Sequence, residues 1–129
     1  MKYMAPRRTT IIIKSLNLFP KQGLNEFGIP YRSEVGYSRP VLIVQDDGFN
    51  ESRIKTIVVV PLTTNLRLLD APGNVLIKKK ESKLKEDSVI IVAQLYAIDR
   101  SRLKEKHSKI TKETMKEVEI GMKLVLGIN

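Results

Sequence analysis

The most regular feature of the sequence is a pair of short apolar runs, rich in β-branched residues and joined by a polar link. The runs are Pro40–Gln45 and Thr56–Leu62, and both have the length of a core strand. Asp46, Asp47 and Gly48 begin the link between them, and residues of these types form turns. The pattern therefore predicts two core strands, with a helical turn or compact loop at residues 49–53 between them.

Polar side chains stand at the ends of these two predicted strands. Arg39 precedes the first strand, and a hydroxyl pair, Thr63 and Thr64, follows the second. In an antiparallel pair the start of one strand lies beside the end of the other. We therefore expect Arg39 and Thr63 to share one edge of the sheet.

Three more strands and a turn are predicted downstream. Ser88–Leu95 is the most continuous apolar run and predicts a central strand. Shorter patterns predict a strand at Val75–Lys78 and a final edge strand at Glu105–Ile110. Asp99 is placed to cap a short turn, Arg100–Leu103, whose basic side chains we expect to face water.

The C-terminal residues have the pattern of an amphipathic helix. Thr111 is a good N-cap for a helix over Lys112–Leu126, and Gly127 stands where a glycine ends such a helix. Apolar residues at helical spacing predict one stripe that packs on the sheet: Met115, Val118, Met122 and Val125.

The first 30 residues are less regular. Thr9–Leu18 has a strand-like pattern, and proline and glycine residues then punctuate the chain too often for a regular element. We therefore expect a strand followed by a loop. At 129 residues, with 42% apolar and 29% charged residues, the whole chain suits a single domain.

Composition limits the cellular compartments and the classes of binding partner that suit this chain. Cysteine is absent, which excludes disulfides and thiolate metal sites, and no apolar run has the length of a membrane span. We therefore expect a cytoplasmic protein with no membrane contact. The formal net charge of +9 favours a polyanionic partner, with nucleic acid as the first candidate and an acidic protein as the second.

Few residues suit metal or acid–base chemistry. His107 is the single histidine and lies in a lysine-rich stretch, so the sequence predicts a surface residue and no metal site. The adjacent pair Asp46 and Asp47 is typical of a turn. The candidate that is left is Arg39 near the threonine pair, because a guanidinium can bind a phosphate or stabilise added charge on it. Spacing alone favours a plain surface cation at the end of a strand as the interpretation of Arg39.

An ordered series of motifs resembles the MazF/PemK (Kid) family of toxin endoribonucleases, from about Ser33 to Gly127. The motifs are Ser33-Glu34, Gly36, Arg39-Pro40-Val41-Leu42-Ile43-Val44-Gln45, Val60-Pro61-Leu62-Thr63-Thr64-Asn65, Pro72-Gly73-Asn74-Val75, Asp87-Ser88-Val89, Ala93-Gln94-Leu95, Ile98-Asp99-Arg100-Ser101-Arg102-Leu103 and Leu124-Val125-Leu126-Gly127. Residues 31–129 form the region that resembles the family, and residues 1–30 form an atypical N-terminal segment.

The resemblance implies a mostly β fold with α structure (α+β), a small and strongly bent antiparallel sheet in an SH3-like, partly closed barrel with a C-terminal helix. It implies a homodimer that cuts single-stranded RNA at short sequences without metal or other cofactor. The 2′-hydroxyl attacks the adjacent phosphate and leaves a 2′,3′-cyclic phosphate and a 5′-hydroxyl. The family's catalytic residues fall on Arg39, which would stabilise the phosphorane and supply the leaving-group proton, and on Thr63, which would hold a phosphate oxygen. Its RNA-binding positions fall on Ser33, Glu34, Thr64 and Gln94.

The same resemblance implies an acidic antitoxin as partner, with DNA contacted only indirectly through the antitoxin complex. The N-terminus departs from the family, whose members open with a basic-Gly-acidic-apolar-aromatic strand that residues 1–30 lack. We expect Thr9–Leu18 to supply the missing strand, because the sheet edge beside it would otherwise be exposed. Two alternatives stay open: a catalytically inactive member that binds antitoxin or RNA, and a gyrase poison of the CcdB type.

Overall fold

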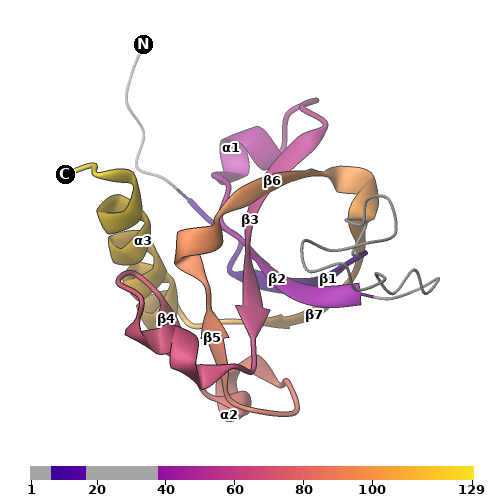
Figure 1. The fold of residues 1–129 in the computed structure, drawn as a ribbon. Coiled ribbons are helices and arrows are strands. Elements are labelled where there is room, and N and C mark those ends of the chain that lie inside the picture. Colours follow the sequence, from indigo (N-terminus) through magenta and orange to yellow (C-terminus); the bar gives the residue numbers. More distant parts are fainter. Residues whose placement is uncertain (1–6, 17–37) are drawn as a thin grey trace, which may run out of the picture.

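The computed structural model describes residues 7–16 and 38–129, which form a curled antiparallel sheet with a C-terminal helix (Figure 1). The strands are β1 Ile11–Leu16, β2 Ser38–Ile43, β3 Thr56–Thr63, β4 Val75–Ile77, β5 Ser88–Ile90, β6 Tyr96–Asp99 and β7 Leu103–Lys109. The α-helices are α1 Asp47–Asn50, α2 Lys79–Ser82 and α3 Lys112–Leu126, and the 3₁₀ turns are η1 Leu66–Asp70, η2 Val92–Gln94 and η3 Arg100–Arg102. None of these helices has the length and apolar character needed to cross a membrane.

The sheet curls because one long strand, β3, is shared by two sets of neighbours. Strand β3 pairs with β2, β2 with β1, and β1 with β7, while β6 pairs with β3 on its other side. Turn η3 joins β6 directly to β7, so these elements form the ring seen in Figure 1. Strands β5 and β4 extend from the far end of β3. This confirms the predicted bent sheet in a partly closed barrel.

Strand β1 confirms that the N-terminal region supplies a strand. It pairs antiparallel with β2 and with β7, and its register places Ser15 opposite Arg39. The edge of β2 beside Arg39 is therefore covered. The predicted loop that follows lies outside the described residues, as do Ser33 and Glu34.

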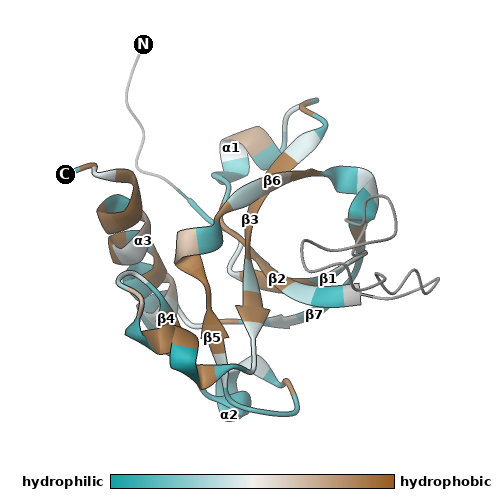
Figure 2. Cartoon of the chain, viewed as in Figure 1, coloured by the Kyte–Doolittle hydropathy of each residue, from teal (hydrophilic) through white to brown (hydrophobic). Residues whose placement is uncertain are grey.

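The two faces of the sheet carry separate apolar clusters. Helix α3 packs on one face, where the larger cluster contains Ile12, Leu42, Val44, Val60, Leu62, Val75, Ile77, Ile90, Val92, Ile110, Met115, Val118 and Met122. The smaller cluster lies on the opposite face of β2, β3 and β6 and contains Val41, Ile43, Ile57, Val59 and Ile98. Figure 2 shows brown, hydrophobic stretches along the central strands, including β3 and β5. Arg39 and Thr63 belong to the alternating positions of the smaller cluster.

Helix α3 has the predicted bounds and caps. The Thr111 hydroxyl accepts a hydrogen bond from the Thr114 backbone N–H at 3.1 Å, and Gly127 ends the helix with φ of 69°. The predicted stripe is buried at Met115, Val118 and Met122. Val125 was wrongly placed in that stripe, since 39% of it is exposed.

The predicted central strand over Ser88–Leu95 is wrong in its second half. Strand β5 ends at Ile90, and Val92–Gln94 forms turn η2 before β6 begins. On β3, Leu62 pairs with Ile90 and Val59 pairs with Tyr96. The step from Val59 to Leu62 is three residues, whereas the step from Ile90 to Tyr96 is six, so the segment opposite β3 is three residues longer. The surplus is accommodated by η2. Apolar periodicity cannot reveal such an insertion, because it depends on the register with another strand.

Arg100 also departs from its prediction, because its guanidinium does not simply face water. Nε donates to the Ile54 carbonyl at 2.7 Å, and the terminal nitrogens donate to the carbonyls of Asn50 and Phe49 at 2.7 and 2.8 Å. The planar guanidinium thus ties η3 to α1 and to the loop after it. The predicted cap is confirmed, since the Asp99 carboxylate accepts from the Ser101 backbone N–H at 2.8 Å.

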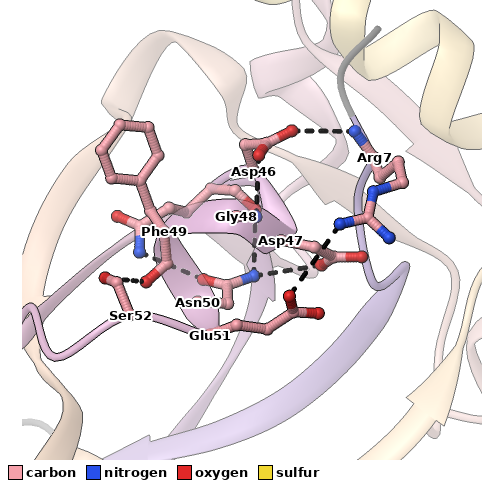
Figure 3. Close-up of polar contacts among 9 residues, drawn as sticks. Arg7, Asp46, Asp47, Gly48, Phe49, Asn50, Glu51 and Ser52 are labelled. Atoms are coloured by element: carbon pink, nitrogen blue, oxygen red, sulfur yellow. Dashed lines mark hydrogen bonds and ion pairs between the residues drawn. The ribbon is translucent and has the colours of Figure 1, made fainter. Parts of the chain in front are cut away.

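Asp46 forms the predicted turn and ties the N-terminal segment to it (Figure 3). Its two carboxylate oxygens accept from the backbone N–H groups of Arg7 and Gly48, both at 2.8 Å. These hydrogen bonds favour the ionised form and hold the pKa of Asp46 below its usual range. Arg7 also lies 3.9 Å from the Glu51 carboxylate, an exposed pair that contributes little stability.

We predict that Asp46 makes stability depend on pH in the acid range. Its folded-state pKa lies below the unfolded value of about 3.9, so its stabilisation is present above that pH and is lost as pH falls through the folded pKa. Asp46→Asn should lower the unfolding midpoint at neutral pH, and the difference from the parent should shrink in acid. Thermal unfolding of both proteins across pH checks this, and a constant difference at all pH values would contradict it.

Candidate functional site

Arg39 and Thr63 lie on adjacent strands at the same end of the sheet. Strands β2 and β3 are antiparallel with Val41 opposite Pro61, and Arg39 and Thr63 each lie two residues further along their own strand, which keeps them on the face of that pair. Directly opposed residues project from the same face. The strand bounds differ from the prediction, because Arg39 is the second residue of β2 and Thr63 the last residue of β3. Both side chains are therefore oriented by strands rather than by loops.

Arg39 lines an open depression of about 590 Å³ on this face. The other described residues that line it are Pro61, Gln94, Tyr96, Ala97 and Arg102. The structure thus brings together Arg39 and Gln94, two of the predicted site residues. Thr63 is not among the described lining residues, and it lies beyond Pro61 toward the end of β3.

The hydroxyl of Thr63 is half-buried and already accepts one hydrogen bond. The Asn65 backbone N–H donates to its Oγ1 at 3.2 Å. That hydrogen bond fixes the position of the Thr63 oxygen, and the O–H group can still donate to a ligand. Thr64 is exposed and lies one residue past β3. The two threonines therefore differ, because only Thr63 is held in the strand register with Arg39.

Gln94 reaches the depression because of the three-residue insertion at η2. It is exposed and ends that turn. Asn74 holds the turn in place, since its side-chain oxygen accepts from the Ala93 backbone N–H at 3.1 Å and its side-chain nitrogen donates to the Leu68 carbonyl at 2.8 Å. Asn74 therefore links η2, which carries Gln94, to η1, which follows Thr63.

Two residues of the depression, Tyr96 and Arg102, were not predicted as site residues. Burial raises the pKa of the Tyr96 phenol, while the guanidinium groups of Arg39 and Arg102 act in the opposite direction. The phenol therefore lies within the electrostatic reach of both cations. The sequence singled out the turn that contains Arg102 but gave no sign that this side chain lies on the same surface as Arg39.

The arrangement supplies hydrogen-bond donors that suit the binding of a phosphate. Among residues 7–16 and 38–129, no cluster of three His, Asp or Glu side chains could hold a metal. His107 is remote from this chemistry, with its Nε2 3.0 Å from the Lys83 carbonyl oxygen. Arginine N–H groups and a threonine O–H are donors that match phosphate oxygens, and they stabilise charge that develops on phosphorus.

Comparison with known proteins gives a consistent family. Residues 24–126 match the family model described as PemK-like, MazF-like toxin of type II toxin-antitoxin system. The curated protein Endoribonuclease MazF2 of Mycobacterium bovis is 31% identical over 103 residues, which is 80% of this chain and 90% of the relative.

Solved structures share the fold. The Mycobacterium tuberculosis toxin MazF-mt6 superposes with a TM-score of 0.69 at 14% identity, over 92% of this chain and 98% of the toxin chain. An endoribonuclease in complex with its cognate antitoxin, from a mycobacterial species, superposes with a TM-score of 0.66 at 20% identity, over 97% and 98% of the two chains. At these identities the likeness concerns the fold alone.

Proposed function

The chain belongs to the PemK-like, MazF-like toxins of type II toxin-antitoxin systems, and we propose that it is an endoribonuclease that cleaves single-stranded RNA without a metal ion. The observation that carries the proposal is the placement of Arg39, which lines an open depression with Gln94 and lies on the strand next to the one that ends at Thr63. Curated relatives are named endoribonucleases, which supports the same activity here.

The proposed reaction is an internal phosphoryl transfer. The ribose 2′-hydroxyl gives up its proton to water as its oxygen attacks the adjacent phosphorus. The bond from phosphorus to the 5′-oxygen breaks, and that oxygen takes up a proton from Arg39, which recovers one from water. The products are a 2′,3′-cyclic phosphate and a 5′-hydroxyl. Arg39 stabilises the charge on the pentacovalent phosphorane and hydrogen-bonds to the leaving oxygen. Thr63 donates its O–H to a phosphate oxygen, and Gln94 and Thr64 contact the RNA beside it.

The test is incubation of the purified chain with single-stranded RNA in the presence of EDTA, followed by identification of the product ends. We expect cyclic-phosphate and 5′-hydroxyl ends. Binding of RNA without cleavage would favour an inactive binding module, and gyrase-dependent breaks in supercoiled DNA would favour a gyrase poison. Strand β1 supports the active form, because it supplies the strand that covers β2 beside Arg39.

We propose an acidic antitoxin as the protein partner. The net charge of +9 suits a polyanionic tail as well as RNA, and a related endoribonuclease is known in complex with its cognate antitoxin. Addition of the cognate antitoxin is therefore expected to stop RNA cleavage. Cleavage that continues with antitoxin in molar excess would contradict this partner.

We further propose a homodimer that uses the outer face of α3. Ile120 and Leu124 lie one turn apart on that face, and Ile128 follows just past the end of the helix; the three are 68%, 60% and 57% exposed, an apolar surface that water would otherwise cover. We predict a dimer in solution and a shift toward monomer for Leu124→Glu, measured by light scattering after size-exclusion chromatography. A parent protein that stays monomeric at high concentration would contradict this prediction.

A further inference from the structure

We infer that Arg102 is a positioning residue that binds a second phosphate of the RNA strand, next to the one held by Arg39. This inference rests on the proposed function and deepens it, because it assigns a role to a residue outside the pair expected to carry the chemistry. Arg102 lines the same depression as Arg39, although the two residues are 63 positions apart in the sequence.

The turn that carries Arg102 is held rigidly. At its start, the Asp99 carboxylate accepts from the Ser101 backbone N–H at 2.8 Å. Its first residue, Arg100, donates to three backbone carbonyls at 2.7 to 2.8 Å. After the turn, Leu103 begins β7 and packs against the smaller apolar cluster. Arg102 therefore projects from an anchored turn, which lowers the entropic cost of using it to bind a ligand.

The depression concentrates positive charge. Arg39, Arg102 and Tyr96 all line this depression, and both guanidinium groups act to lower the pKa of the Tyr96 phenol. The described residues that line the depression include no carboxylate. Two guanidinium groups that line one concave surface are favourable for a polyanion that binds across them.

A single strand of RNA supplies such a polyanion, with one negative phosphate per nucleotide. If Arg39 holds the phosphate that reacts, Arg102 is placed for a neighbouring phosphate, and the half-buried Tyr96 ring, which lines the same depression, offers a surface for a base. Arg102 helps to bind the RNA before the reaction, and it does not stabilise the charge that forms on phosphorus during the reaction. Its loss should therefore raise KM more than it lowers kcat.

The test uses a short 2′-O-methyl RNA of mixed sequence, which cannot be cleaved because its 2′-oxygen is blocked. Its affinity is measured by fluorescence anisotropy as salt is raised, for the parent, Arg102→Ala and the control Lys116→Ala. Lys116 carries the same charge on an exposed position of α3, the helix that packs on the other face of the sheet. We expect Arg102→Ala to bind several-fold more weakly and to reduce the salt slope by about 0.7, the value for one phosphate on a single strand.

Cleavage kinetics on unmodified RNA complete the experiment. We expect a raised KM and a nearly unchanged kcat for Arg102→Ala, in contrast to a lost kcat for Arg39→Ala. Affinity and salt slope equal to those of Lys116→Ala would overturn the inference. A parent chain that binds the blocked RNA through Arg102 but cuts no RNA would contradict the proposed function and leave this phosphate site standing. If Arg102→Ala does not fold, Arg102→Gln replaces it, because glutamine removes the charge but keeps more of the side-chain volume.

Discussion

Arg39→Ala is expected to lower the rate of RNA cleavage by roughly 10²–10³-fold, the typical effect of removing one preorganised donor to developing negative charge. The loss should appear in kcat, because the guanidinium interacts most strongly with the phosphorane, which carries more charge than the ground-state phosphate. Arg39 is exposed, so its truncation should leave the unfolding midpoint close to that of the parent.

Two further variants make this result specific. Arg39→Lys keeps the positive charge but loses the planar fork, so we expect only a partial recovery of kcat. Arg53→Ala removes the same residue type from an exposed loop outside the depression and should cleave like the parent. The assay is single-turnover cleavage in EDTA with saturating protein. Full activity of Arg39→Ala would remove Arg39 from the reaction and with it the proposed mechanism.

The sequence was most informative where local chemistry decides the structure. Thr111 and Gly127 mark the ends of α3 because a hydroxyl cap and a left-handed glycine act within one turn of the helix. The pairing of β2 with β3 followed from two apolar runs and the turn between them. The positions of Arg39 and Thr63 at one sheet edge then follow from antiparallel geometry alone.

Features that depend on distant partners were not predictable in this way. Turn η2 exists because the segment opposite β3 has a three-residue surplus, and that surplus places Gln94 at the depression. Arg100 and Arg102 occur in one short basic turn, yet one binds backbone carbonyls and the other lines the depression. A charge pattern does not distinguish these roles, since the difference lies in what each side chain meets across the fold.

The contact between α3 and the turn before β4 is a second feature that only the structure reveals. A Cβ atom added at Gly121 would lie 2.2 Å from the carbonyl oxygen of Gly73 and 3.2 Å from its Cα. Because the obstacle is backbone, it cannot rotate away, and the helix or the turn must move. The next residue of the turn, Asn74, hydrogen-bonds to Ala93 in η2, so the movement should extend toward Gln94.

We therefore predict that Gly121→Ala destabilises the protein, although alanine is the better helix former by about 1 kcal/mol. Overpacking of this kind costs typically about 1–3 kcal/mol and occasionally more, so the net change should be a clear loss and a lower unfolding midpoint. Below that midpoint, RNA cleavage should also weaken, because η2 shifts with the turn that holds it. Thermal unfolding followed by circular dichroism measures the first effect, and single-turnover cleavage measures the second.

Gly127→Ala is the matched control for this prediction. Gly127 has φ of 69° and no atom within 4 Å of an added Cβ, so alanine there meets backbone strain without crowding. Its cost should be about 1 kcal/mol, with cleavage unchanged, since an added Cβ there displaces no neighbouring atom and so does not push on the turn that holds η2. An unfolding midpoint for Gly121→Ala equal to or above that of the parent would mean that α3 and the Gly73 turn are not in close contact. The structural link from α3 through Asn74 to Gln94 would then be wrong as well.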